Sequence, residues 1–172
     1  MIETVLFYFF AGAAVISALM LVMRKNPVTS AVSLIITFIS FAGLYILLNA
    51  HFIAAIQILV YAGAIMVLFL FVIMLLDLKR EEDFLSMLKA QKFFGIALAV
   101  IVLAEVFAAI SSINGMLLTR GIYSAENIVG AGGNTKVIGR LLFTDFILPF
   151  EVTSILLLVA IIGAVYLGKK EN

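Results

Sequence analysis

Apolar residues along this chain gather in five long runs, separated by short segments that carry charge, proline or glycine. The runs cover residues 4–23, 28–48, 52–76, 93–113 and 149–167. A helix of about 20 apolar residues crosses the hydrocarbon core of a bilayer, so each run is long enough to span a membrane. The pattern predicts an all-α integral membrane protein with five transmembrane helices, and residues 1–172 are expected to form a single membrane domain.

The first two breaks predict how the first three helices connect. Charge and proline end the first run at residues 24–27. Pro27 is a favoured first residue for the second helix, because the N–H that proline lacks has no partner in a first turn. Residues 49–51 leave room only for a tight turn, so the second and third helices are predicted to form an antiparallel hairpin.

The two later connections are longer. Residues 77–92 are highly charged and are expected to be partly helical at the membrane surface. Residues 114–148 are rich in glycine and form the longest connection. Within it, residues 130–136 superficially resemble a phosphate-binding loop, but the glycines lack the required spacing and no strand–helix frame surrounds them. We interpret this stretch as a flexible loop.

The distribution of lysine and arginine predicts the orientation. With five spans, eight of the eleven positive residues fall in connections on one side of the membrane and three on the other. Positive residues accumulate in cytoplasmic connections. The N-terminus is therefore predicted outside and the C-terminus in the cytoplasm, with a long external loop between the fourth and fifth helices.

Composition excludes several classes of function. The chain is 65% hydrophobic and 12% charged, with a mean hydropathy of +1.28, whereas a soluble domain is about 45–50% apolar. A formal net charge of +1 gives no reason to expect nucleic-acid binding. With no cysteine and one histidine, the chain lacks the ligands for an iron–sulfur cluster or a dense metal site. No metal and no cofactor is expected within it.

Small residues recur at helical spacing in three of the runs and predict close contacts between helices. Roughly half of these contacts are expected within the chain and the others with partner subunits. The residues are Ala14 and Ala18 in the first run, Ala104, Ala108 and Ser112 in the fourth, and Ala160, Ala164 and Gly168 in the fifth.

The third run carries polar groups and a glycine that a plain membrane span does not need. One face of an α-helix would carry Gln57, Tyr61, Ala64 and Leu68. Of these, Gln57 and Tyr61 are candidates to order water or a neighbouring side chain. Gly63 lies nearby, and a glycine in mid-helix is a place where the hydrogen-bond ladder can slip into a π-bulge. Tyr61, Gly63 and Ala64 are therefore candidates for a switchable helix. The alternative is ordinary hydrogen bonding between helices.

Three carboxylates lie within or beside the spans. Glu105 is the only one well inside a span, where an ionised acid is costly, and it is a candidate proton relay or a protonated structural acid. Asp77 ends the third helix on the predicted cytoplasmic side and is interpreted as a solvated interfacial residue. Glu151 begins the fifth helix, where the helix dipole favours a carboxylate.

These residues together resemble a known family. Residues 57–76, with the core VYAGAIMVLF at 60–69, closely resemble the third helix of subunit J of proton-pumping NADH:quinone oxidoreductase, respiratory complex I. Its mitochondrial counterpart is the sixth core ND subunit. The Asn-Pro pair at residues 26–27 is similar to the turn after the first helix of that family. Residues 138–143 and 149–151 resemble its entry into a fifth helix.

The resemblance implies a non-antiporter subunit in the membrane arm of complex I, in the inner membrane of a bacterium. In that family the third helix can hold a π-bulge near the positions of Tyr61 and Gly63, and its switching is thought to open and close a water path. Some relatives carry an acid at the position of Gln57. FMN, iron–sulfur clusters and the quinone are expected in partner subunits, which include the quinone-site subunit and small antiporter-like subunits.

Two other functions remain open at this point. The chain could be an autonomous small ion transporter or channel, although it has no detectable inverted repeat. It could also be a purely structural assembly subunit. Related complexes driven by ferredoxin or by a reduced deazaflavin cofactor use similar membrane subunits, so the sequence leaves the electron donor open.

Overall fold

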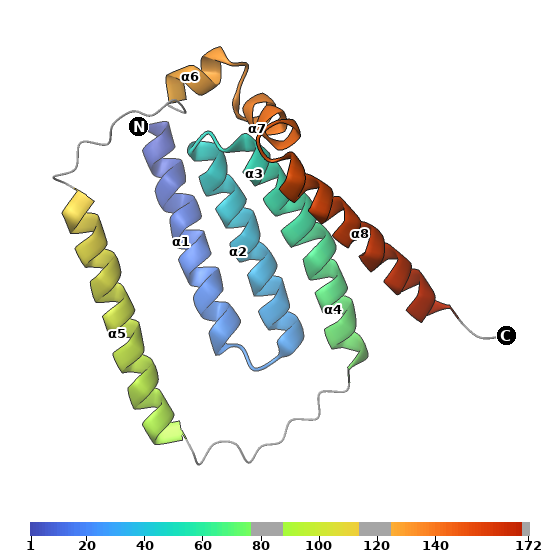
Figure 1. The fold of residues 1–172 in the computed structure, drawn as a ribbon. Coiled ribbons are helices and arrows are strands. Elements are labelled where there is room, and N and C mark those ends of the chain that lie inside the picture. The colour runs from blue at the N-terminus through green and yellow to red at the C-terminus, as the bar shows by residue number, and fades with distance from the viewer. Residues whose placement is uncertain (77–87, 114–124, 170–172) are drawn as a thin grey trace.

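The computed structural model describes residues 1–76, 88–113 and 125–169, and these residues are helical apart from short turns and ends (Figure 1). The described elements, in chain order, are α1 (Ile2–Met23), α2 (Pro27–Leu47), α3 (His51–Ile56), η1 (Gln57–Ile65), α4 (Met66–Leu75), α5 (Leu88–Ile113), α6 (Ala125–Gly130), α7 (Asn134–Phe143) and α8 (Ile147–Gly168).

Five helical segments are long and apolar enough to cross a membrane. They are α1, α2, the continuous segment His51–Leu75 made of α3, η1 and α4, the segment Phe94–Ser111 of α5, and α8. The prediction of an all-helical protein with five spans is therefore confirmed. The helices alone do not fix which side of the membrane each terminus occupies, so the orientation stays a prediction.

Helix α2 is the centre of a three-helix unit. It packs against α1 on one side and against α3, η1 and α4 on the other, which confirms the predicted hairpin. Small side chains make the contacts close, and Ala14, Ala31, Ala42 and Ala54 are all buried. At Gly43 the Phe10 ring of α1 lies so near that a Cβ atom would be 2.6 Å from it, and no larger residue fits there without displacing the ring.

Local chemistry explains both turns of this unit. The Asn26 side chain accepts hydrogen bonds from the backbone N–H groups of Val28 and Thr29, at 2.9 and 3.4 Å, and so caps α2 just ahead of Pro27. At the other end of α2, Asn49 takes a left-handed φ of 59°. Asparagine tolerates this conformation better than most residues, and it lets the chain reverse within a few positions.

Helices α5 and α8 stand apart from the three-helix unit. Among the described helices, α8 packs only against α7, and α5 packs against none. The predicted small-residue contacts divide accordingly: Ala14 is buried against α2, whereas Ala104, Ala108, Ala160 and Ala164 are exposed. The chain alone therefore does not close into a five-helix bundle.

The interpretation of residues 130–136 as a flexible loop is wrong. Helix α6 ends at Gly130 and α7 already begins at Asn134. Gly132 and Gly133 take φ values of 96° and 95° and make the break, a conformation that glycine adopts at little cost. The glycines that favoured a loop are confined to this turn, and the next ten residues carry the apolar spacing of an amphipathic helix.

Candidate functional site

The third membrane segment is wound in two ways. Its ends are α-helical, but η1, from Gln57 to Ile65, is a π-helix, the winding in which an N–H donates to the carbonyl five residues earlier, as the N–H of Met66 does to Tyr61. The flanking residues Ile56 and Met66 have ordinary α-helical backbone angles, so the helix continues without a break. Single-turn π-bulges are the usual form, and they occur often at functional sites. Tyr61, Gly63 and Ala64 all lie inside this segment, and their role as a gate stays a prediction.

A side chain at Gly63 would meet the backbone of the preceding π-helical turn. A Cβ atom on this residue would be 3.2 Å from the carbonyl oxygen of Ile58, which is closer than ordinary van der Waals contact. Ile58 is the residue five positions earlier, and its carbonyl faces Gly63 because of the π winding. A larger residue at position 63 would therefore crowd the π form.

Gln57 begins the π-helix and is 93% buried, since 7% of its surface is exposed. Its amide forms no hydrogen bond with the described part of the chain. In that part, no completely enclosed side-chain nitrogen or oxygen lacks a partner, so the amide of Gln57 is not completely enclosed. A buried amide is costly unless its hydrogen bonds are satisfied. Gln57 is thus suited to bind a water molecule or a polar group of a partner subunit.

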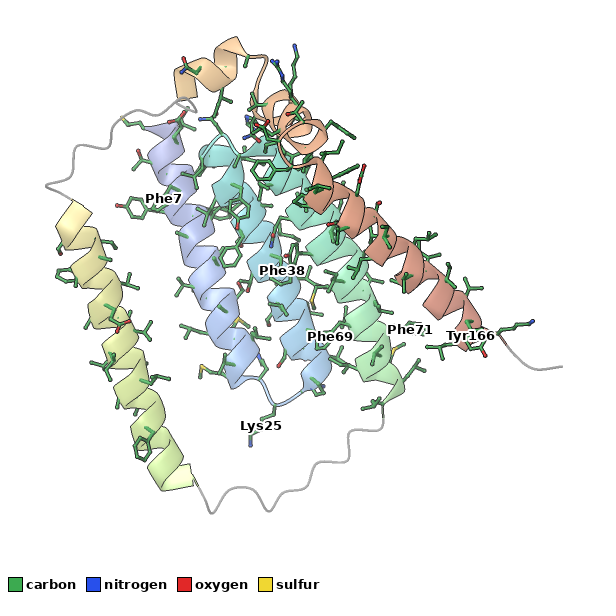
Figure 2. The ribbon with its side chains drawn as sticks, viewed as in Figure 1. Phe7, Lys25, Phe38, Phe69, Phe71 and Tyr166 are labelled. Atoms are coloured by element: carbon green, nitrogen blue, oxygen red, sulfur yellow. The ribbon has the colours of Figure 1, made fainter. Side chains whose placement is uncertain are left out.

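Tyr61 faces a different environment. Its ring contacts the ring of Phe38 on α2 edge to face, with the centroids 5.6 Å apart, and 44% of its surface is exposed. Figure 2 shows Phe38 on the side of α2 that faces the third helix. Gln57 is buried whereas Tyr61 and Ala64 are exposed. A π-helix has more residues per turn, so positions seven apart, such as Gln57 and Ala64, no longer align, and the shared face expected for an α-helix does not extend to Ala64.

A row of hydroxyl groups lies between α1 and α2, and sequence reasoning missed it. The hydroxyls of Ser17 and Thr37 are 2.8 Å apart and form the side-chain hydrogen bond between the two helices. Ser33 and Ser40 are also buried and donate to carbonyls one turn earlier in α2. The spacing of Ser33, Thr37 and Ser40 on one face of a span was the signal available in the sequence.

A second feature that the sequence did not reveal lies at the start of the third helix. The side chain of Asn134, the first residue of α7, accepts a hydrogen bond from the backbone N–H of Phe52 at 3.3 Å. Helix α3 has no side-chain cap of its own, because its N-cap residue is Ala50. Asn134 therefore serves as a cap supplied from a distant part of the chain.

The three predicted carboxylates have separate outcomes. Glu105 is exposed on α5, which packs against no other described helix, so the structure does not bring it near the third segment. Asp77 lies outside the described residues. The expectation that Glu151 occupies a first turn is wrong, because α8 begins at Ile147 and Glu151 is its fifth residue. Pro149 fits within the first turn because no N–H is needed there, and the dipole favours a carboxylate chiefly in that turn.

In the described ranges no group of three or more histidine or acidic side chains is placed to hold a metal ion. The site is therefore made of helix geometry, an amide, a phenol and hydroxyls. Such groups can order water and pass hydrogen bonds, and they carry no redox chemistry of their own.

Comparison with known proteins gives a consistent result. A family model described as NADH-ubiquinone/plastoquinone oxidoreductase chain 6 matches residues 17–167. The NADH-quinone oxidoreductase subunit J of Rickettsia bellii is 38% identical, over 98% of this chain and 81% of the relative. The NAD(P)H-quinone oxidoreductase chain 6 of Leptolyngbya boryana is 41% identical, over 99% and 81%. Subunit J of Rhodobacter capsulatus is 38% identical, over 96% and 81%.

Proposed function

The chain belongs to the family of NADH-ubiquinone/plastoquinone oxidoreductase chain 6, and on that premise we propose that it is a membrane-arm subunit of a NADH:quinone oxidoreductase. In this role it couples quinone reduction to proton translocation through its third helix. The observation that carries the coupling role is the π-helix η1, which lies in mid-span and contains Gln57, Tyr61 and Gly63.

Interconversion of π and α winding provides the mechanism. An α-helix turns by roughly 100° per residue. A π-bulge holds one residue more than the α-helix it interrupts, so a return of that bulge to α winding would rotate α4 by about this angle. Met66 is 2% exposed and packs inside the three-helix unit, whereas its neighbours Val67 and Leu68 are exposed. Rotation of α4 would move Met66 away from α2 and bring a different side chain of α4 into its place. An apolar seal could thus give way to a hydrated gap beside Gln57, and the reverse rotation would close it.

Redox chemistry in this proposal belongs to partner subunits. The chain has no cysteine to ligate an iron–sulfur cluster, and FMN, the clusters and the quinone are assigned to the other subunits. The uncovered surfaces of α5 and α8 are the natural places for partners. These would include the quinone-site subunit and small antiporter-like subunits. We place the complex in the bacterial inner membrane with the N-terminus of this chain outside and its C-terminus in the cytoplasm.

Copurification tests the assignment. The tagged chain should be extracted in a mild detergent, and we expect it to bring with it flavin, iron–sulfur centres reducible by NADH, and quinone reductase activity. Recovery with ferredoxin- or deazaflavin-dependent activity instead would change the electron donor. The chain reconstituted by itself in liposomes should show no ion flux above background, and saturable flux would favour an autonomous transporter.

A different measurement distinguishes a purely structural role from the coupling role. Variants at Tyr61 and Gly63 would then change the amount of assembled complex but not the number of protons pumped per electron. The coupling role requires the opposite outcome, with normal assembly and reduced pumping.

A further inference from the structure

Helix α7 carries two positive charges on its exposed face, and the Lys136 side chain lies over Gly132 in the turn before the helix. Lys136 and Arg140 are one turn apart and exposed. Within the described residues neither takes part in an ion pair. The other face of α7 packs toward α3, α6 and α8 and carries the half-buried side chains Val137, Ile138, Leu141 and Leu142. Two cations that no described acid pairs with, on one side of an amphipathic helix, are placed to receive an anion.

The two cations line an open groove with an apolar wall. The groove has a volume of about 650 Å³ and includes Phe143 and Thr144 further along α7. The Phe143 ring contacts the ring of Phe150 in α8, with the centroids 4.9 Å apart. The groove therefore places the two cations beside Phe143, whose ring adjoins the first residues of α8.

The position of α7 relative to the spans defines its environment. It lies at the end of the molecule where α3 and α8 begin, and Asn134 ties it to the first turn of α3. With the five apolar helices placed across a bilayer, this end would lie at the level of the lipid headgroups. An amphipathic helix with basic residues on its polar face is typical of a segment that lies in the membrane interface.

We propose that this groove binds an anionic phospholipid, with Lys136 and Arg140 on its phosphate and its acyl chains along Phe143, Phe150 and α8. Cations beside an apolar surface match a molecule that joins a phosphate to hydrocarbon. A free phosphate would leave the apolar wall uncovered. An acidic segment of a partner protein would meet the cations but would leave the adjoining rings of Phe143 and Phe150 without an apolar partner.

The test compares lipids on the full-length chain in a mild detergent, by native mass spectrometry. We expect phosphatidylglycerol to bind more tightly than phosphatidylcholine. Lys136→Gln with Arg140→Gln should weaken phosphatidylglycerol binding about 25-fold, since each cation near a membrane surface contributes about fivefold. The matched control, Arg24→Gln with Lys25→Gln, removes the same charge at the α1–α2 turn and should change the affinity less than twofold.

The controls distinguish the loss of charge from an effect of the substitutions on folding. Lys136→Arg with Arg140→Lys should keep wild-type affinity, and helix content measured by circular dichroism should be equal in all variants. Equal binding of the two lipids, or an equal loss in both charge-removal variants, would overturn the proposal. Competition by millimolar inorganic phosphate would assign the groove to the free anion. Capture of protein in place of lipid by a photoreactive residue at position 144 in the assembled complex would also overturn it.

Discussion

The side-chain oxygen of Asn134 accepts a hydrogen bond from the backbone N–H of Phe52, which lies 82 positions earlier in the chain, at 3.3 Å. Phe52 belongs to the first turn of the third membrane segment, and this segment becomes a π-helix five residues later, after α3 ends at Ile56. The long connection before α8 therefore does more than join two spans. It holds the end of the helix that carries the candidate gate.

Removing this cap should loosen the start of the third helix. We expect Asn134→Ala to lower the free energy of unfolding by about 1 kcal/mol, the usual contribution of a capping side chain. Hydrogen exchange at residues 51–56 should become faster, because the amide of Phe52 loses its partner. Asn134→Asp keeps an acceptor oxygen and should show a smaller change. The neighbouring exposed residue gives the control, and Thr135→Ala should leave exchange in α3 unaltered.

Substitution of Gly63 should damage coupling more than folding. Gly63→Val places a Cβ atom 3.2 Å from the carbonyl oxygen of Ile58 in the π form. Overpacking of this kind costs about 1–3 kcal/mol, which lowers the population of the π form roughly 5–150-fold. We expect complex that assembles with its flavin and iron–sulfur centres intact. Quinone reductase activity and proton pumping should each fall about fivefold or more.

Gly12 provides the matched control for this experiment. It also lies in a membrane helix, but a Cβ atom there would meet no atom within 4 Å. Gly12→Val should therefore leave activity and pumping near the wild-type values. If the Gly63→Val complex assembles and works normally, the gating role of η1 is refuted.

The hydrogen bond between Ser17 and Thr37 should hold α1 on α2. Ser17→Ala and Thr37→Val, alone and combined, form a double-mutant cycle, and we expect a coupling energy of about 0.6 kcal/mol, the average for such bonds in membranes. Unfolding in a mixed micelle with increasing sodium dodecyl sulfate measures it. Ser40→Ala removes a hydroxyl that bonds only within α2 and should show no coupling to Ser17.

Glu105 tests whether a carboxylate on α5 takes part in proton transfer. We expect Glu105→Gln to assemble normally, because the amide keeps hydrogen-bonding groups and removes a charge that is costly at mid-membrane. Proton yield per NADH should fall by about half or more, since an amide cannot release a proton in turnover. Glu105→Asp should retain most of the yield. An unchanged yield in Glu105→Gln would leave the residue with a structural role only.

The sequence predicted the spans well because lipid imposes a simple rule. Every backbone group in hydrocarbon must be bonded internally, so an apolar run of sufficient length becomes a helix. The charge and proline near Pro27 and the turn at Asn49 also act locally, and their effects can be read from neighbouring residues. The π-bulge predicted near Gly63 was also a local inference, because a glycine in mid-helix is a place where the hydrogen-bond ladder can slip.

Features that depend on distant parts of the chain were not predictable in this way. The pairing of Asn134 with Phe52 joins segments that no local pattern connects. The turn of Ala64 away from Gln57 follows from π winding, whereas the expected shared face assumed α geometry. Helix α7 was missed because glycines at its border dominated the reading of residues 130–136. The position of α5 depends on surfaces that this chain does not contain.

The isolation of α5 and α8 has a consequence for the life of a newly made copy. Helices α1, α2 and the third segment can form their mutual contacts as soon as they enter the bilayer, since all three lie in the first half of the chain. The other two spans have few or no contacts among the described helices. Synthesis in excess of partner subunits would leave copies whose later spans diffuse in lipid and remain open to membrane proteases. Cellular levels of this chain should therefore follow the supply of its neighbours more closely than its own rate of translation.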